Sequence, residues 1–158
     1  MAISADDDLL RIVKTSAHIV HVEGEGYGVS PQLWTSMEGG CSVELLSMLE
    51  AANVLVNDRI VSQKGLGATK ISVSAVRNTM NRIDQKTKQG VEPLGIAYTP
   101  IAPDQPYGPN PYHCDIFPKL GNPGRNLLHS KASLVCLDQN EAKALWEKRH
   151  GITPAGES

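Results

Sequence analysis

The sequence predicts an α+β domain built from a single mixed sheet, a few packed helices and one long proline-rich loop. Its composition is that of a globular protein: 41% of the 158 residues are hydrophobic and 20% are charged, which is too apolar for a disordered chain. Some segments alternate apolar and polar residues with the period of two that is typical of a strand, and others place their apolar residues at helical spacing. Fourteen glycines and ten prolines indicate many loops, so we do not expect long continuous helices to dominate.

The first half of the chain predicts strands followed by a helix. Residues 9–14 form a short apolar run that suits a strand or a helical turn, and residues 17–22 alternate like a strand. Three glycines within residues 24–28 predict a turn after that strand. Ser42 is a good helix cap, and Leu45, Leu46 and Leu49 share one stripe, so we expect a helix from Ser42 to about residue 52.

The middle of the chain predicts a strand that changes into a helix. Residues 71–75 alternate, and Val76, Met80 and Ile83 then follow at helical spacing, which places the change near Ser74. Gly90 ends that predicted helix. Two more strands are expected at residues 94–99 and 112–117, and they form the centre of the predicted sheet.

Between these two strands lies the proline-rich loop. Residues 100–111 hold five prolines, which cannot donate the hydrogen bonds of a sheet, so this segment is expected to run over the surface. A last helix is predicted at residues 138–150, with Asp138 as its cap and Trp146 packing on the sheet. The domain is therefore expected to span residues 1–151, and residues 152–158 to form a frayed tail.

Charge is unevenly distributed along the chain. The overall net charge of −2 is composed of −7 in residues 1–58, +6 in residues 59–90 and −1 in the remainder. The acidic and basic blocks can face each other or form solvated surfaces, or the basic block can bind a polyanion. For the last hypothesis the candidate binding residues are Arg77, Arg82, Lys86, Lys88, Lys64 and Lys70, and the predicted helix would bring several of them to one side.

The cysteines and the start of the chain favour a cytoplasmic protein. Cys41, Cys114 and Cys136 are widely spaced and odd in number, which suits reduced thiols rather than a disulfide framework. Residues 1–8 are acidic where a signal peptide would be basic and then apolar. The sequence has no run of about 18 apolar residues, so we expect no membrane-spanning segment.

Chemistry is best supported at His113-Cys114-Asp115. On a strand, His113 and Asp115 lie on the same face, and a carboxylate beside a histidine can hold the imidazole in one tautomer for use as a general base. His129 is a third candidate that could join them from the next element. The structural alternative is that His113 only bonds to the backbone of the proline-rich loop and holds it in place, and without a nucleophile motif we favour this second reading.

Metal and cofactor sites are not predicted. His18 and His21 are three residues apart on a predicted strand and would point to opposite faces, so they do not form a metal pair. The glycines of residues 24–28 and 64–70 lack the spacing of known phosphate-binding loops, although Lys64 and Lys70 flank two of them and could hold an anion.

Several short motifs carry a resemblance to known proteins. Leu9-Leu10-Arg11, Ser30 with Trp34, Ser42-Val43 and Asn110-Pro111-Tyr112-His113 occur in the same order as in a family of small bacterial proteins of no established activity. This resemblance covers residues 6–117 and implies a bacterial or phage origin. The order of Arg11, Ser30 and Ser42 also resembles that of ADP-ribosyltransferase-like folds, which implies an NAD site lined by such residues, but no glutamate motif accompanies it.

Two functions are therefore compatible with the sequence. The first is a non-catalytic module that engages a partner protein or a nucleic acid through its acidic and basic faces. The second is a small enzyme that uses His113 with Asp115 on a phosphodiester or a nucleotide. We favour the first, because the sequence contains no complete catalytic motif.

Overall fold

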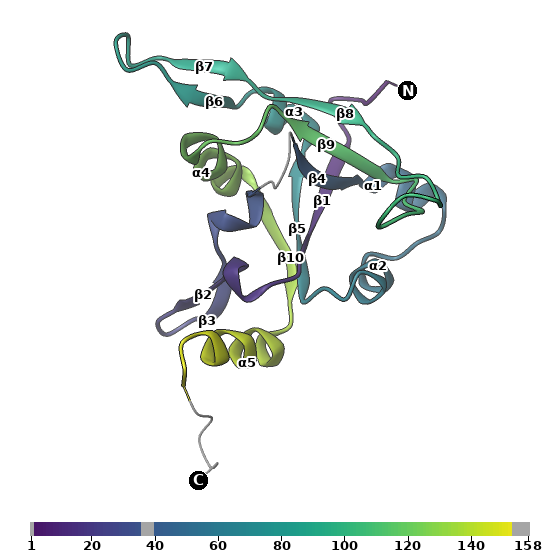
Figure 1. The fold of residues 1–158 in the computed structure, drawn as a ribbon, viewed down its shortest axis with the longest axis vertical. Coiled ribbons are helices and arrows are strands. Elements are labelled where there is room, and N and C mark those ends of the chain that lie inside the picture. Colours follow the sequence, from purple (N-terminus) through teal and green to yellow (C-terminus); the bar gives the residue numbers. More distant parts are fainter. Residues whose placement is uncertain (1, 36–39, 153–158) are drawn as a thin grey trace.

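A computed structural model describes residues 2–35 and 40–152 and confirms the α+β class. Its centre is a six-stranded sheet in the order β10-β5-β1-β4-β9-β8, and every neighbouring pair is antiparallel (Figure 1). The strands are β1 (Asp8–Val13), β4 (Cys41–Leu45), β5 (Gly67–Ser72), β8 (Gly95–Tyr98), β9 (His113–Phe117) and β10 (Ser133–Leu137).

Two hairpins and several short helices surround this sheet. One hairpin is β2 (Ile19–Val22) with β3 (Gly26–Val29), and the other is β6 (Met80–Ile83) with β7 (Gly90–Pro93). The helices are the 3-10 turns η1 (Ser16–His18) and η2 (Pro31–Trp34), and α1 (Leu46–Ala51), α2 (Val56–Ser62), α3 (Val73–Arg77), α4 (Asn122–Lys131) and α5 (Gln139–Arg149). None of the helices within the described ranges is long and apolar enough to cross a membrane.

The two faces of the sheet bury two separate apolar clusters. Alternate residues of β1 divide between them: Leu9 and Val13 pack into the larger cluster with Trp34, whereas Leu10 and Ile12 pack into a smaller cluster. The smaller cluster is completed by Leu49, Ile60 and Ala68. Because both faces of the strand are covered, β1 reads as a nearly continuous apolar run rather than as a clear alternation.

The prediction that a helix starts at Ser42 is wrong. Residues 41–45 form strand β4, and the helix α1 starts only at Leu46. Cys41, Val43 and Leu45 are buried in the larger cluster, and Ser42 lies on the opposite face of the strand. The burial of three apolar residues on one face favours a strand here, and this outweighs the preference of a single serine for a helix cap.

The long helix predicted from Ser74 to Gly90 is also wrong. Ser72 caps the short helix α3, its Oγ accepting a hydrogen bond from the amide of Ala75 at 3.0 Å, but the helix ends at Arg77. The chain then forms the β6–β7 hairpin, whose turn begins where Asp84 accepts hydrogen bonds from the amides of Lys86 and Thr87. An Asp side chain that binds the backbone two and three residues ahead stabilises a turn, and this outweighs the helical spacing of the apolar residues.

The last helix forms as predicted. Asp138 caps α5 by accepting a hydrogen bond from the amide of Glu141 at 3.1 Å. The helix contacts the β2–β3 hairpin and η1, and Trp146 is partly buried against the larger cluster. Its indole lies 5.2 Å from the ring of His21 and 5.9 Å from that of Tyr27. Helix α4 and strand β10 were not predicted from the sequence. Most of the predicted tail at residues 152–158 lies outside the described residues.

The central sheet opens between β1 and β4. These strands pair only at Leu9 with Leu45 and at Leu10 with Glu44. Beyond this point the guanidinium of Arg11 lies between β1 and the neighbouring segments, donating from Nη1 to the carbonyl of Ser42 at 2.6 Å and from Nε to that of Leu33 at 3.0 Å. The side chain of Arg11 therefore takes the place of the backbone hydrogen bonds between β1 and β4. The gap between the two strands leads into a pocket.

Candidate active site at the opening of the sheet

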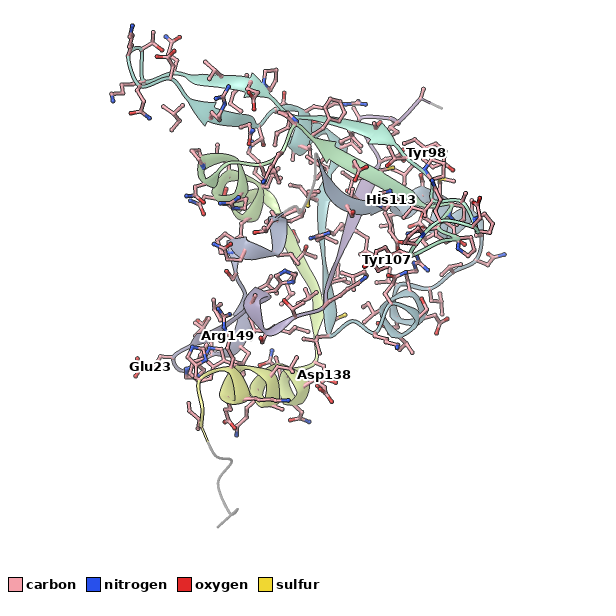
Figure 2. The ribbon with its side chains drawn as sticks, in the orientation of Figure 1. Glu23, Tyr98, Tyr107, His113, Asp138 and Arg149 are labelled. Atoms are coloured by element: carbon pink, nitrogen blue, oxygen red, sulfur yellow. The ribbon has the colours of Figure 1, made fainter. Side chains whose placement is uncertain are left out.

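A pocket of about 280 Å³ lies where β1 and β4 separate. Its wall combines β1, η1, β4, the end of α2, the proline-rich loop and β9. The side chains that matter for chemistry are Arg11, Lys14, His18, Ser42, Tyr107 and His113. Figure 2 shows Tyr107 and His113 on the same side of the molecule, whereas Asp138 and Arg149 lie far from them. Most of helix α5 therefore lies away from this part of the pocket, although the helix contacts η1, which contributes His18 to the wall.

His113 is held by hydrogen bonds at both ring nitrogens. Its Nδ1 lies 2.7 Å from the backbone carbonyl oxygen of Thr99, which can only accept, so Nδ1 carries the proton. Its Nε2 lies 3.0 Å from Oγ of Ser42 and is free to accept the hydroxyl proton. The ring is 12% exposed, while Ser42 is exposed. This is the arrangement of a hydroxyl nucleophile beside a general base whose tautomer is fixed.

Asp115 is the cross-strand partner of Ser42 and lies beside this pair. As predicted, it shares a strand face with His113, opposite the buried Cys114 and Ile116. Its Oδ2 accepts a hydrogen bond from the Thr99 hydroxyl at 3.0 Å, and its Oδ1 lies 3.8 Å from Nε2 of His113. Asp115 does not line the pocket. It is placed to stabilise a positive charge that forms on the imidazole.

His129 is not brought to this site. It lies on α4, which packs against β6, η2 and α3, and it is absent from the pocket wall. Its Nδ1 is buried without a hydrogen-bond partner, and burial lowers its pKa. The three histidine and aspartate candidates of the sequence therefore separate into a pair, His113 with Asp115, and a distant residue.

The wall of the pocket is positively charged. The ammonium of Lys14 donates to Oε1 of Gln63 at 2.8 Å, and burial, followed by the nearby charge of Arg11, lowers its pKa. The same two causes lower the pKa of His18 to about 4, so this ring is neutral at pH 7. Its Nδ1 is buried and has no partner among the described residues. The charge of Arg11 thus contributes to the lowered pKa of both Lys14 and His18.

The carboxylate in the wall does not offset these charges. Glu44 is buried and forms a two-pronged ion pair with Arg59, with Nε 2.6 Å from Oε1 and Nη2 in contact with Oε2. The side chain of Asn110 donates to Oε2 at 2.7 Å. The hydrogen bond that Arg59 donates to Glu44 is the largest cause of the raised pKa of Arg59. Since Glu44 is satisfied by Arg59, the pocket retains the positive charges of Arg11 and Lys14.

The basic block does not form one continuous surface. Arg77 donates to the carbonyl of Ile3, Arg82 pairs with Glu92 at 2.6 Å, and Lys70 lies 4.0 Å from Asp8. Lys86 and Lys88 occupy the turn of the β6–β7 hairpin, and Lys64 follows α2. These six residues come from four separate parts of the fold, because the helix expected to align them is a hairpin.

Apart from the resemblance to ADP-ribosyltransferase-like folds, sequence reasoning assigned no chemical role to three of the pocket residues. Ser42 was interpreted as a helix cap, Lys14 had no role, and Arg11 entered only through that resemblance. The available signal was Arg11 itself, a charged residue inside an otherwise apolar strand. Of the two serines that carried the resemblance to ADP-ribosyltransferase-like folds, Ser42 lines the pocket with Arg11, whereas Ser30 caps η2 by accepting a hydrogen bond from the amide of Gln32.

No protein-family model matches the chain, and no significant match is found among curated proteins or solved structures. In the part of the chain that the structure describes, no group of three or more His, Cys, Asp or Glu side chains could hold a metal ion.

Proposed function

We propose that the protein is an enzyme that cleaves or transfers a small phosphoester in this pocket, with Ser42 as the nucleophile and His113 as the general base. One observation carries the proposal: the Ser42 hydroxyl bonds to the unprotonated nitrogen of His113, whose other nitrogen is fixed by a backbone carbonyl. Such a pair needs no cofactor, and the catalytic histidine is the one that the sequence singled out.

The reaction follows from the direction of these hydrogen bonds. Nε2 of His113 takes the hydroxyl proton as Oγ of Ser42 attacks phosphorus, and the bond from phosphorus to the leaving oxygen breaks. The imidazolium then gives this proton to the leaving oxygen, so the charges balance. Water, or a second alcohol, attacks the phosphoserine by the reverse steps and restores the free hydroxyl.

The charges of the site support a phosphoryl group in particular. Arg11 and Lys14 supply positive charge to the wall, and the carboxylate of Glu44 is already paired. Fixed cations are effective catalysts where negative charge develops in a water-poor site. Oδ1 of Asp115 is 3.8 Å from Nε2, on the side of the ring that faces Ser42, and its negative charge stabilises the transient imidazolium.

Hydrolysis of bis(4-nitrophenyl) phosphate, followed by the absorbance of released 4-nitrophenolate, tests the proposal. We expect Ser42→Ala and His113→Asn each to lower the rate by about 10²–10⁴-fold. Ser133→Ala and His129→Asn are matched controls, because these residues lie on β10 and α4 outside the pocket, and they should keep the wild-type rate. Equal rates in wild type and Ser42→Ala would contradict the assignment.

A second function, binding of a polyanion such as nucleic acid, is favoured by one feature. The β6–β7 hairpin extends away from the body of the molecule, and the exposed Lys86 and Lys88 lie in its turn (Figure 1). Retention on heparin should fall with salt and disappear in Lys86→Glu/Lys88→Glu, whereas charge reversal of Lys143 on α5 should preserve it. If the wild type is not retained at low salt, these lysines form only solvated surface.

A cytoplasmic location and a protein partner belong to the same proposal. All three cysteines are free thiols, and two of them, Cys41 and Cys114, are buried in the larger cluster. A reducing compartment keeps such thiols intact. Co-purification of a partner from bacterial cytoplasm, lost when the hairpin lysines are reversed, would support this part.

A further inference from the structure

Tyr107 is a feature of the pocket that the proposed reaction does not use. It lines the mouth of the pocket, yet 94% of its surface is exposed. No aromatic ring among the described residues stacks on it. A large aromatic side chain that covers nothing in the protein and stands over a cavity is suited to contact a bound molecule.

The backbone around Tyr107 is held firmly. Ile101 and Asn110 exchange two hydrogen bonds of 2.9 Å across the proline-rich loop, and the amide of Gly108 donates to the carbonyl of Gln105 at 3.0 Å. At Gly108 even a Cβ atom would come within 1.9 Å of the carbonyl oxygen of Ala102, so this part of the loop is closely packed. The ring is thus presented from a defined position.

The conformation of Tyr107 also points to a function. Its φ is +67°, in the left-handed region that glycine or asparagine occupies more easily than tyrosine. A bulky residue in this region is strained, and such strain is concentrated at ligand sites and active sites. The loop therefore retains an aromatic side chain where a smaller residue would fit the backbone better.

The wall of the pocket also suits an anion. It includes Arg11 and Lys14, and His18, whose Nδ1 is buried and has no hydrogen-bond partner among the described residues. Three of the five donor protons of Arg11 are directed to carbonyl oxygens, the third at 3.4 Å, which leaves two for a ligand. Lys14 is exposed to solvent, and partial burial together with the nearby charge of Arg11 lowers its pKa despite the opposing effect of Glu44.

We propose that the substrate is a nucleotide, whose base stacks on Tyr107 while its phosphate lies between Arg11 and Lys14 and against Ser42. This inference rests on the proposed function for the reacting group and adds the part of the substrate that does not react. The pocket, at about 280 Å³, is at the lower end of small-molecule sites, which span about 300–1,000 Å³. A base that lies on Tyr107 at the mouth does not need to fit inside.

Binding is measured by calorimetry in the Ser42→Ala protein, so that nothing is turned over. The probes are adenosine 5′-monophosphate and ribose 5-phosphate, which share the phosphate and the sugar and differ only in the base. We expect the first to bind more tightly. Tyr107→Ala should weaken adenosine monophosphate by at least about fivefold, since loss of one stacked base costs that much or more, and leave ribose 5-phosphate unchanged.

Two further variants separate the contacts. Tyr107→Phe keeps the ring and should bind both probes as Ser42→Ala alone does. Lys14→Gln removes a phosphate contact and should weaken both probes by the same factor. Melting temperatures of all variants verify that the loop is intact.

The inference is overturned if both probes bind equally, if neither binds, or if Tyr107→Ala leaves the affinity for adenosine monophosphate unchanged. Failure of the proposed reaction is recognised separately, because covalent labelling of Ser42 by a fluorophosphate does not require a base. A protein that is labelled at Ser42 but indifferent to the base is a phosphoesterase with a different substrate. A protein that binds the base through Tyr107 but is never labelled is a nucleotide-binding module.

Discussion

His113 uses its two ring nitrogens for different purposes. Nδ1 donates to the carbonyl of Thr99, where the proline-rich loop begins, and Nε2 accepts from Ser42. The sequence suggested two alternative roles for His113, one structural and one catalytic. The structure assigns a hydrogen bond for each role to a different nitrogen of the same ring. A substitution that removes only one side can separate them.

His113→Asn and His113→Ala make this separation. The asparagine amide keeps a donor for the Thr99 carbonyl but has no basic nitrogen for Ser42, so we expect a melting temperature close to wild type with loss of activity. His113→Ala leaves the carbonyl of Thr99 without the hydrogen bond from His113 and should lower the free energy of unfolding by about 1–3 kcal/mol. Urea denaturation of both variants checks this, and equal destabilisation by the two substitutions would refute the division of roles.

His18 makes the stability of the protein depend on pH. Its pKa is about 4 in the folded state, against 6.5 for the free side chain, mainly because of burial. Between these values the unfolded chain binds a proton that the native protein does not, so stability is complete above about pH 6.5 and falls as the pH drops toward 4.

His18→Asn should therefore lose less stability than the wild type between pH 7 and pH 5. The ring is only partly buried and solvent screens part of the effect, so we expect a difference of no more than about 2 kcal/mol. Urea midpoints at the two pH values measure it. The same decrease in both proteins would show that His18 does not titrate in this way.

Glu44 connects three elements around the pocket. It lies on β4, binds Arg59 of α2, and accepts a hydrogen bond from Asn110 in the proline-rich loop. Arg59 in turn lies with its guanidinium carbon 5.3 Å from the ring centre of Tyr112. This buried pair fixes the position of the loop that carries Tyr107 relative to the strand that carries Ser42.

Glu44→Gln should lower the free energy of unfolding by about 3–5 kcal/mol, because it leaves a largely buried guanidinium without its carboxylate. Glu44→Gln with Arg59→Met should recover part of this loss, since the unpaired charge is removed as well. Chemical denaturation of the two variants tests the pair. If the double variant is less stable than Glu44→Gln alone, the pair is not the reason for the loss.

The N-terminal end of helix α5 is held by two side chains. Asp138 caps its first turn, and Gln139 binds both the amide and the carbonyl of Tyr27, at 2.9 and 3.0 Å. We expect Asp138→Ala to cost about 1 kcal/mol of stability, the usual value of an N-cap. Since Asp138 itself does not line the pocket, hydrolysis of bis(4-nitrophenyl) phosphate should be unchanged in this variant. A loss of activity in the folded variant would show that α5 acts on the pocket.

The architecture could be predicted from the sequence where local signals agree. The strands at 94–99 and 112–117, the last helix and the α+β class follow from periodicity and capping. The predictions failed where a segment served two faces of the sheet, as at Ser42, or where a side chain of a turn outweighed helical spacing, as at Asp84. Long-range strand pairing decides the first case and is not contained in a single sequence, whereas the second depends on a local turn whose signal was overlooked.

The candidate site shows the same limit. His113 and Asp115 could be found because they are neighbours on one strand. Ser42 lies 71 positions away from His113 and reaches it only through the antiparallel pairing of β4 with β9. Arg11 comes from β1, at the place where that strand parts from β4. The pocket is a property of the whole molecule, built by strands that pair and then separate.

Reaction with diisopropyl fluorophosphate, read by mass spectrometry of the peptides, tests the central claim most directly because it requires no knowledge of the substrate. An activated serine attacks the phosphorus and expels fluoride, which adds one dialkyl phosphoryl group to its oxygen. We predict one adduct, on Ser42, that is absent in Ser42→Ala, strongly slowed in His113→Asn and unchanged in His129→Asn. A wild-type protein that stays unlabelled, or that is labelled at Ser42 as fast in His113→Asn as in wild type, would contradict the account.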